Sequence, residues 1–170
     1  MKIFLIGLPG SGKSTIGEAL ANRLNMEFID LDKKIEEREG MIVPEIFAAQ
    51  GEDYFRRVES ELLREWASTP GSFVMSTGGG TPCFFDGINV INQSGVSIFL
   101  DEQVDVIVKR LENNVHRPLL KSSNADDMRT KLQHLREVRL GVYTQASITV
   151  ASPTLGKVVE SLAPKREREH

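Results

Sequence analysis

Nine consecutive residues near the amino terminus carry the clearest chemical signal in the chain. Residues 7–15, Gly-Leu-Pro-Gly-Ser-Gly-Lys-Ser-Thr, fit the pattern G-x-x-x-x-G-K-[ST] of a phosphate-binding loop, or P-loop. Glycines allow the backbone N–H groups of such a loop to turn inward around an anion. A glycine-rich turn before an ordinary helix is the alternative. The apolar run at residues 3–6 and the helical pattern after the loop favour the phosphate site.

The side chains that close this loop indicate a nucleoside triphosphate. Lys13 can reach the β- and γ-phosphates, and the hydroxyl of Ser14 can be a ligand of Mg²⁺. The helix that begins here points its positive end at the same phosphates.

Hydrophobic periodicity predicts the elements that position the loop. Strands are expected at residues 2–6, 27–30, 72–76, 96–100 and 147–150. Helices are expected at residues 14–24, 32–39, 44–49, 52–67, 84–93, 103–111, 125–141 and 154–162, with Asn124 as the cap of the seventh. This alternation predicts an α/β fold with a five-stranded parallel sheet flanked by helices. Ligands of such sheets bind beyond the carboxyl ends of the strands, where the P-loop, Asp30 and residues 78–80 should meet.

Composition limits the function classes. The chain has 170 residues and a formal net charge of −3, which suits a single domain, residues 1–170, and argues against a nucleic-acid binder. Cys83 is the only cysteine, so an internal disulfide is excluded and a cytoplasmic location fits. No apolar run approaches the length of a membrane span, and no signal peptide is apparent. We expect a monomer without membrane partners.

Two carboxylates follow the second predicted strand. If that strand continues, Asp30 and Asp32 leave it on one face, where one could join a Mg²⁺ shell and the other could position an acceptor hydroxyl. A strand end followed by a helix cap explains the same residues equally well.

Several arginines are ambiguous from the residues alone. Glu59 lies three residues after Arg56, so the pair is either a solvated ion pair, the commoner case, or an arginine held ready for an anion. Residues 112–124 form a loop long enough to be a lid, and Arg117 within it could fold over phosphates. Arg139 near the end of the long helix needs no function at all.

Taken together, the motifs resemble the shikimate kinase family over residues 3–150. The resemblance rests on the P-loop and on Asp-Leu-Asp (30–32), Ile-Phe-Ala-x-x-Gly-Glu (46–52), Phe-Arg-Arg-Val-Glu (55–59), Gly-Gly-Gly (78–80), Arg-Pro-Leu-Leu (117–120) and Arg-x-x-x-Tyr (139–143). It implies a P-loop NTPase of the nucleoside-monophosphate-kinase-like fold, with a substrate-binding region at residues 32–60 and a mobile lid at 112–124. It also implies ATP-dependent phosphorylation of the 3-hydroxyl of shikimate in aromatic amino-acid biosynthesis.

The resemblance implies a role for each ambiguous residue. ATP phosphates would be held by Gly10, Ser11, Gly12, Lys13, Ser14 and Thr15, with Mg²⁺ on Ser14 and Asp30. Shikimate would be bound by Asp32, Arg56, Gly79 and Arg139, with both arginines on its carboxylate. Arg110 would lie along the adenine. Lys13, Asp32 and Arg117 would carry the transfer step, Asp32 by orienting the hydroxyl.

One segment departs from the family pattern. The family often has a basic or polar residue near the adenine after the fifth strand, whereas this chain has Ala-Ser-Pro-Thr at residues 151–154. Loose base selectivity is therefore expected. The rival interpretations are a gluconate-type kinase on the same fold and a nucleotide-binding regulatory module without turnover. The first gives no account of Asp32, Arg56 and Arg139 together, and the second gives none of an intact set of catalytic residues.

Overall fold

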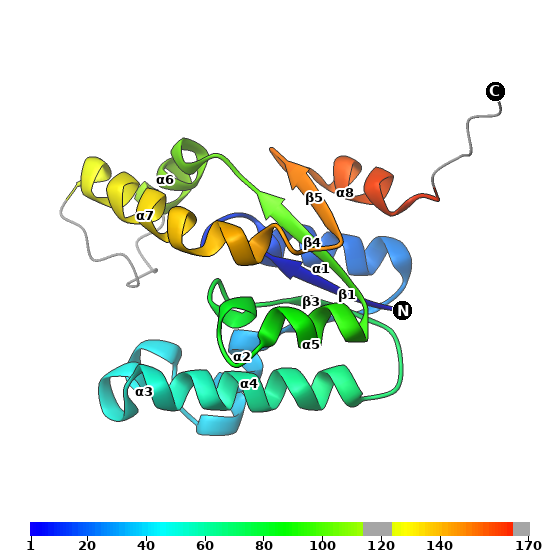
Figure 1. The fold of residues 1–170 in the computed structure, drawn as a ribbon, viewed down its shortest axis with the longest axis horizontal. Helices are drawn as coiled ribbons and strands as arrows, with labels where there is room; N and C mark the ends of the chain where they lie inside the picture. Colours follow the sequence, from blue (N-terminus) through cyan, green and yellow to red (C-terminus); the bar gives the residue numbers. More distant parts are fainter. Residues whose placement is uncertain (114–123, 165–170) are drawn as a thin grey trace.

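A five-stranded parallel sheet forms the centre of the computed structural model, which describes residues 1–113 and 124–164 (Figure 1). Its strands are β1 (Lys2–Ile6), β2 (Glu27–Asp30), β3 (Phe73–Ser76), β4 (Val96–Asp101) and β5 (Ile148–Ala151). They pair in the order β2-β3-β1-β4-β5, and every pairing is parallel. The predicted fold class is confirmed, and each strand lies within one residue of its predicted bounds.

The helices also follow the prediction closely. They are α1 (Lys13–Leu24), α2 (Leu31–Glu39), α3 (Val43–Gln50), α4 (Glu52–Ser68), α5 (Gly87–Ser94), α6 (Val104–Glu112), α7 (Ala125–Tyr143) and α8 (Leu155–Leu162). The predicted cap is confirmed, because the side chain of Asn124 accepts a hydrogen bond of 2.8 Å from the backbone N–H of Asp127.

One helix start was predicted wrongly. The pattern indicated a helix from residue 84, but the chain first makes a short 3₁₀ turn, η1 (Thr81–Cys83), and α5 begins only at Gly87. Phe85 and Asp86, just before α5, have positive φ angles of 48° and 60°. At Gly87 the chain comes so close to η1 that an added Cβ would lie 2.1 Å from the carbonyl oxygen of Thr81.

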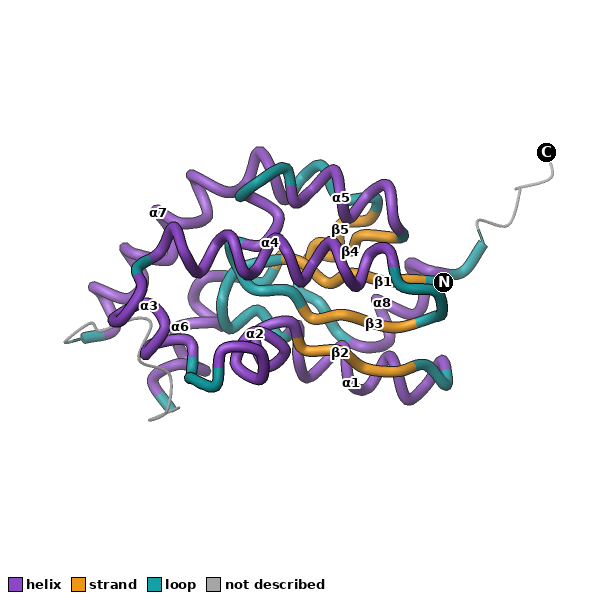
Figure 2. Tube along the Cα trace, turned by 90° about the horizontal axis from the view of Figure 1, so that it is seen from below, coloured by secondary structure: helices purple, strands orange, loops and turns teal. Residues whose placement is uncertain are grey.

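Helices cover both faces of the sheet (Figure 2). One core joins the side chains of Phe4, Met75 and Phe99 to those of α4, α5 and α7. The alternate side chains of the same strands, such as Leu5 and Val74, pack with α1 and α8 in a second core. Because both faces are buried, β1 and β3 are apolar on both sides, as strands of a parallel sheet commonly are.

The strand order places the P-loop at the middle of one edge. After β1 the chain forms the edge strand β2, returns to β3 between β2 and β1, and then continues on the other side of β1 with β4 and β5. The loop after β1 therefore lies where the direction of winding reverses, which is where open α/β sheets bind ligands. Among the described residues, no helix is long and apolar enough to cross a membrane.

Candidate active site

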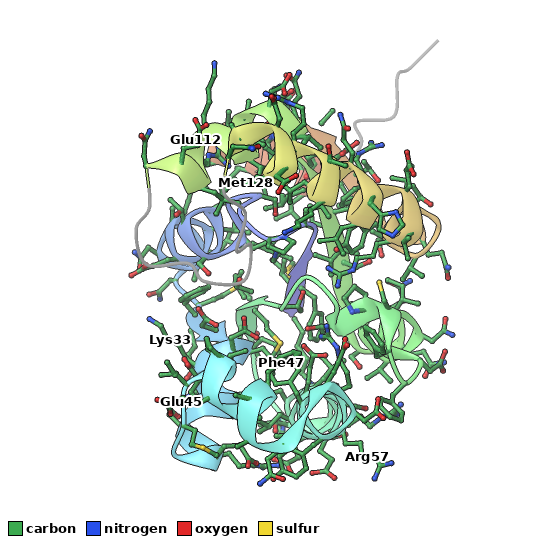
Figure 3. The ribbon with its side chains drawn as sticks, turned by 90° about the vertical axis from the view of Figure 1, so that its left-hand side faces the viewer. Lys33, Glu45, Phe47, Arg57, Glu112 and Met128 are labelled. Atoms are coloured by element: carbon green, nitrogen blue, oxygen red, sulfur yellow. The ribbon has the colours of Figure 1, made fainter. Side chains whose placement is uncertain are left out.

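A pocket of about 810 Å³ opens at the carboxyl ends of the strands. Its walls include the P-loop, the two aspartates after β2 and the glycines after β3, so residues far apart in sequence meet as predicted. Figure 3 looks at this end of the molecule, with Lys33 of α2 and Met128 of α7 on opposite sides of the pocket that both residues line. The predicted lid arginine, Arg117, lies outside the described residues.

The P-loop is shaped by its glycines. Gly10 and Gly12 have φ angles of 78° and 98°, and Gly12 directly precedes α1. Lys13 is buried, and its Nζ donates to the carbonyl oxygens of Gly7 and Leu8 at 2.8 Å each. Its ammonium group therefore lies within the loop and close to the Asp32 carboxylate, whose pKa it lowers.

Ser11 is a second sign of a ligand at this loop. Its hydroxyl oxygen is buried and has no hydrogen-bond partner among the described residues. Buried hydroxyls in folded proteins are normally paired, so a ligand or ordered water would be expected to complete this one. The cradle thus fits a polyphosphate.

Three oxygen atoms gather beside the P-loop. The hydroxyl of Ser14 lies 3.5 Å from Oδ2 of Asp30 and 3.2 Å from the hydroxyl of Ser76. Oxygen ligands of this kind suit Mg²⁺, which commonly takes its remaining ligands from substrate phosphates and water. In the described part of the chain, no group of three His, Cys, Asp or Glu residues could hold a metal by itself. The residues present therefore fit a Mg²⁺ ion that arrives with a nucleotide.

The two aspartates are not on one strand face. Asp30 ends β2 and caps α2, because its Oδ1 accepts from the backbone N–H of Lys33 at 3.3 Å. Leu31 is buried as the first residue of α2, and Asp32 lies in its first turn. Of the two interpretations that the sequence left open, the strand end followed by a helix cap is therefore confirmed, and both carboxylates line the pocket.

Asp32 is in an unusual electrostatic environment. Burial and, after it, the negative charges of Glu59 and Asp30 together raise the pKa of its carboxyl group to about 6, against the opposing effect of the Lys13 charge. A carboxylate with this pKa is ionised at neutral pH and still accepts a proton readily, which suits a general base.

The glycine triplet brings charged groups together because it has no side chains. A Cβ on Gly78 would lie 3.0 Å from Oε2 of Glu59 and 3.1 Å from Oδ1 of Asp32. A Cβ on Gly79 would lie 3.0 Å from Nη1 of Arg139, and one on Gly80 would lie 2.6 Å from the Arg56 guanidinium. Gly78 therefore admits two acidic side chains, and the next two glycines admit one arginine each.

Arg56 and Glu59 form a buried pair rather than a solvated one. Their exposed fractions are 8% and 2%, and Nη1 of Arg56 donates to Oε1 of Glu59 at 3.0 Å. Thr81 donates to the other oxygen of Glu59 at 2.9 Å, and the ring of Phe84 lies 4.3 Å from the guanidinium carbon. Burial raises the pKa of Glu59, and Arg56 opposes that shift. The structure thus excludes the commoner interpretation of this sequence pair.

Tyr143 joins α7 to the glycine triplet at residues 78–80. Its hydroxyl donates to the carbonyl oxygen of Gly79 at 2.5 Å, and burial raises its pKa to about 12. Arg139, one turn earlier on α7, is half-buried against Gly79. The two candidate anion-binding arginines therefore lie against adjacent glycines, Arg139 at Gly79 and Arg56 at Gly80.

Arg110 lies on the nucleotide side of the pocket. It donates from Nη1 to the carbonyl oxygen of Gly10 at 3.1 Å and from Nη2 to Glu102 at 3.0 Å. Sequence reasoning missed Glu102, Thr81 and Ser76. The signal available for Glu102 and Ser76 was only a polar residue at or just after the end of a buried strand, and for Thr81 there was none.

Comparisons with known proteins agree with this geometry. A family model for shikimate kinase matches residues 9–163. A shikimate kinase from Azobacteroides pseudotrichonymphae is 39% identical over 167 residues, which cover 96% of this chain and 98% of that protein.

Two solved structures are also similar. A shikimate kinase from Bacteroides thetaiotaomicron superimposes with a TM-score of 0.87 at 38% identity, covering 95% of this chain and 93% of that one. A shikimate kinase from Acinetobacter baumannii, solved in complex with shikimate, gives a TM-score of 0.84 at 31% identity, with coverages of 94% and 90%.

Proposed function

The chain belongs to the shikimate kinase family, and we propose that its pocket transfers the γ-phosphoryl group of ATP to the 3-hydroxyl of shikimate. This reaction serves aromatic amino-acid biosynthesis. The observation that supports it most strongly is that one pocket is lined by the P-loop, by Asp32 and by the glycines at positions 78 and 79. Arg139 lies against Gly79, and Arg56 lies against the adjacent Gly80.

ATP would occupy the P-loop side. Backbone groups of residues 10–15 would surround its phosphates, Lys13 would neutralise their charge, and Arg110 would lie along the adenine. Ser14 and Asp30 would hold Mg²⁺, which when bound supplies positive charge that stabilises the phosphates during transfer. The lid arginine Arg117 would add a further positive charge from within residues 112–124.

Shikimate would occupy the glycine-triplet side. Arg56 and Arg139 present two planar guanidinium groups, which bind a carboxylate more specifically than lysine does. Gly79 would allow the ring to approach the backbone, and residues 32–60 would form the substrate-binding region. The two guanidinium groups suit an acceptor that carries a carboxylate, and the nearby Asp32 suits one that also carries hydroxyl groups.

Asp32 would orient the acceptor hydroxyl and take up its proton. In that step the hydroxyl oxygen forms a bond to the γ-phosphorus, the proton passes to the Asp32 carboxylate, and ADP leaves with the electron pair of the broken P–O bond. The pKa of about 6 supports this role. Positioning and charge stabilisation would supply most of the rate.

We propose that the enzyme works as a monomer, because one chain supplies the P-loop, both aspartates and the glycines that line the pocket. A cytoplasmic location is supported by the ATP that the reaction consumes and by the lone cysteine.

The test is ADP release from Mg-ATP with shikimate, with gluconate and without an acceptor. We expect turnover with shikimate alone, and a product whose ³¹P signal couples to the proton on carbon 3. Turnover with gluconate would reject the acceptor assignment. ADP binding without any turnover would favour a nucleotide-binding module.

A further inference from the structure

Glu102 is a buried carboxylate on the nucleotide side of the molecule. It directly follows β4, and only 6% of its surface is exposed. A buried carboxylate is costly unless it is paired and hydrogen-bonded. Here Oε1 accepts from the backbone N–H of Gln103 at 3.0 Å, and Oε2 accepts from Nη2 of Arg110 at 3.0 Å. The fold therefore keeps this charge in place by means of Arg110.

Arg110 in turn bridges Glu102 and the P-loop. Nη2 reaches Glu102, while Nη1 donates to the carbonyl oxygen of Gly10 at 3.1 Å. A Cβ on Gly12 would lie 3.6 Å from the same Nη1, so the guanidinium lies directly beside the loop. Arg110 also lines the pocket, together with Pro153 and Thr154. Two of its hydrogen bonds thus fix a guanidinium group that is otherwise partly exposed at the pocket wall.

The neighbouring carboxylate does something different. Asp101 accepts from Nη2 of Arg136 at 3.2 Å on each oxygen, which ties β4 to α7. Both of these side chains are partly exposed, and neither makes a described hydrogen bond to the P-loop. Two adjacent acidic residues therefore hold arginines of two different helices, and only one of the pairs reaches the phosphate loop.

We propose that Glu102 is a positioning residue for the nucleotide, which acts by holding Arg110 beside the P-loop in the orientation that receives the base. A free arginine side chain loses rotamer freedom when a ligand immobilises it, whereas a side chain already fixed by a carboxylate has lost that freedom beforehand. A fixed, planar guanidinium can stack on a flat ring. This inference rests on the nucleotide-binding part of the proposed function.

The experiment measures dissociation constants of ADP and of inorganic pyrophosphate by titration calorimetry. Glu102→Gln keeps the size of the side chain but turns an amide toward Arg110. We expect it to weaken ADP binding roughly three- to tenfold. Pyrophosphate has no base, and the bond from Arg110 to Gly10 remains, so its binding should change less than about twofold. Glu102→Asp, which withdraws the carboxylate from Arg110, should weaken ADP binding in the same direction.

Two further variants test whether Glu102 acts through Arg110. Asp101→Asn removes the same charge one residue away and should leave ADP binding unchanged. In an Arg110→Ala background, Glu102→Gln should cause no additional loss, since the partner is gone. Unchanged ADP binding in Glu102→Gln and Glu102→Asp would overturn the proposal. So would an equal loss for ADP and pyrophosphate, or an equal loss with and without Arg110. A wild-type protein that binds neither ligand would instead contradict the proposed function, and this inference with it.

Discussion

The two ends of the pocket are built in different ways. The nucleotide end is formed by consecutive residues whose backbone carries most of the site, with Gly10 and Gly12 at positive φ and Lys13 folded onto its own loop. The acceptor end is formed by side chains from α2, α4 and α7 that converge on three glycines with no side chains of their own.

The difference lies in where the energetic cost falls. The nucleotide end buries one charged side chain, Lys13, whose ammonium group donates to two carbonyl oxygens of its own loop, and the helix amino terminus adds attraction for anions. The acceptor end buries two charged side chains, Arg56 and Glu59, and partly buries Asp32, and burial raises the pKa values of both acids. A site of this second kind gains specificity for an anionic acceptor at a cost in stability. If the two ends work independently, a substitution at one end should leave ligand binding at the other end unchanged.

The largest effect is expected for Asp32→Asn. The amide keeps the shape of the side chain but cannot accept the proton, so kcat should fall by roughly 10²- to 10⁴-fold. Steady-state kinetics and calorimetric titration with ADP check this. ADP affinity within about threefold of the wild type would support separate ends, whereas a kcat near the wild-type value would remove Asp32 from the chemical step.

A smaller effect is expected for Gly79→Ala, which probes the point where the two ends touch. The added Cβ would lie 2.9 Å from Cδ of Pro9 and 3.0 Å from Nη1 of Arg139. Displacing Arg139 should lower kcat/KM for shikimate on the order of 10²-fold, with a smaller rise in KM for ATP. Gly141→Ala is the matched control on α7, because nothing lies within 4 Å of its added Cβ. Equal changes in both KM values for Gly79→Ala would show that the ends are not separate.

The next effect is the pH dependence of kcat/KM for shikimate, which should change about tenfold per pH unit in the acid range. Asp32 must be ionised to accept a proton, and its pKa is raised to about 6. The value of kcat/KM for shikimate at saturating ATP should therefore be constant above pH 7 and fall about tenfold for each unit below pH 6. A profile that stays flat down to pH 5 would exclude Asp32 as the titrating base.

The smallest effect is expected for the folding stability of Asp32→Asn, which should exceed that of the wild type above the pKa of Asp32. The folded state raises the pKa of Asp32 from 3.8 to about 6, so the folded chain binds this proton more tightly than the unfolded chain does. The resulting stabilisation is present at low pH and is lost as the pH rises through 6. Asp32→Asn should thus be more stable than the wild type at pH 8 by roughly 1–3 kcal/mol. Urea unfolding should show the gap narrowing at pH 5, and a less stable variant at pH 8 would contradict this.

The same contrast explains what could be predicted from the sequence. The P-loop was recognisable because its residues are contiguous and its function depends on the backbone, so no tertiary information is needed. Strand ends were predictable because a strand buried on both faces is a run of apolar residues with a sharp limit, as in β1 and β4.

The acceptor end could not be predicted by residue patterns alone. Arg56 and Glu59 have the spacing of any helical surface pair, and only the packing of α4 under η1 makes the pair buried. Arg139 reaches Gly79 because α7 packs beside η1, next to the glycine triplet, which no local pattern encodes. Resemblance to a family singled out these residues before the fold did. The helix start at Gly87 was missed because the chain makes a 3₁₀ turn and passes through two residues with positive φ, Phe85 and Asp86, before the helix begins.

The most direct test of the account is calorimetric titration of Arg139→Ala with shikimate and, separately, with ADP. We expect shikimate affinity to fall by roughly 10- to 100-fold, since a charge-assisted carboxylate contact is lost. ADP affinity should remain within about twofold of the wild type. Unchanged shikimate affinity, or an equal loss of both ligands, would contradict an acceptor site built on Arg139 apart from the nucleotide site.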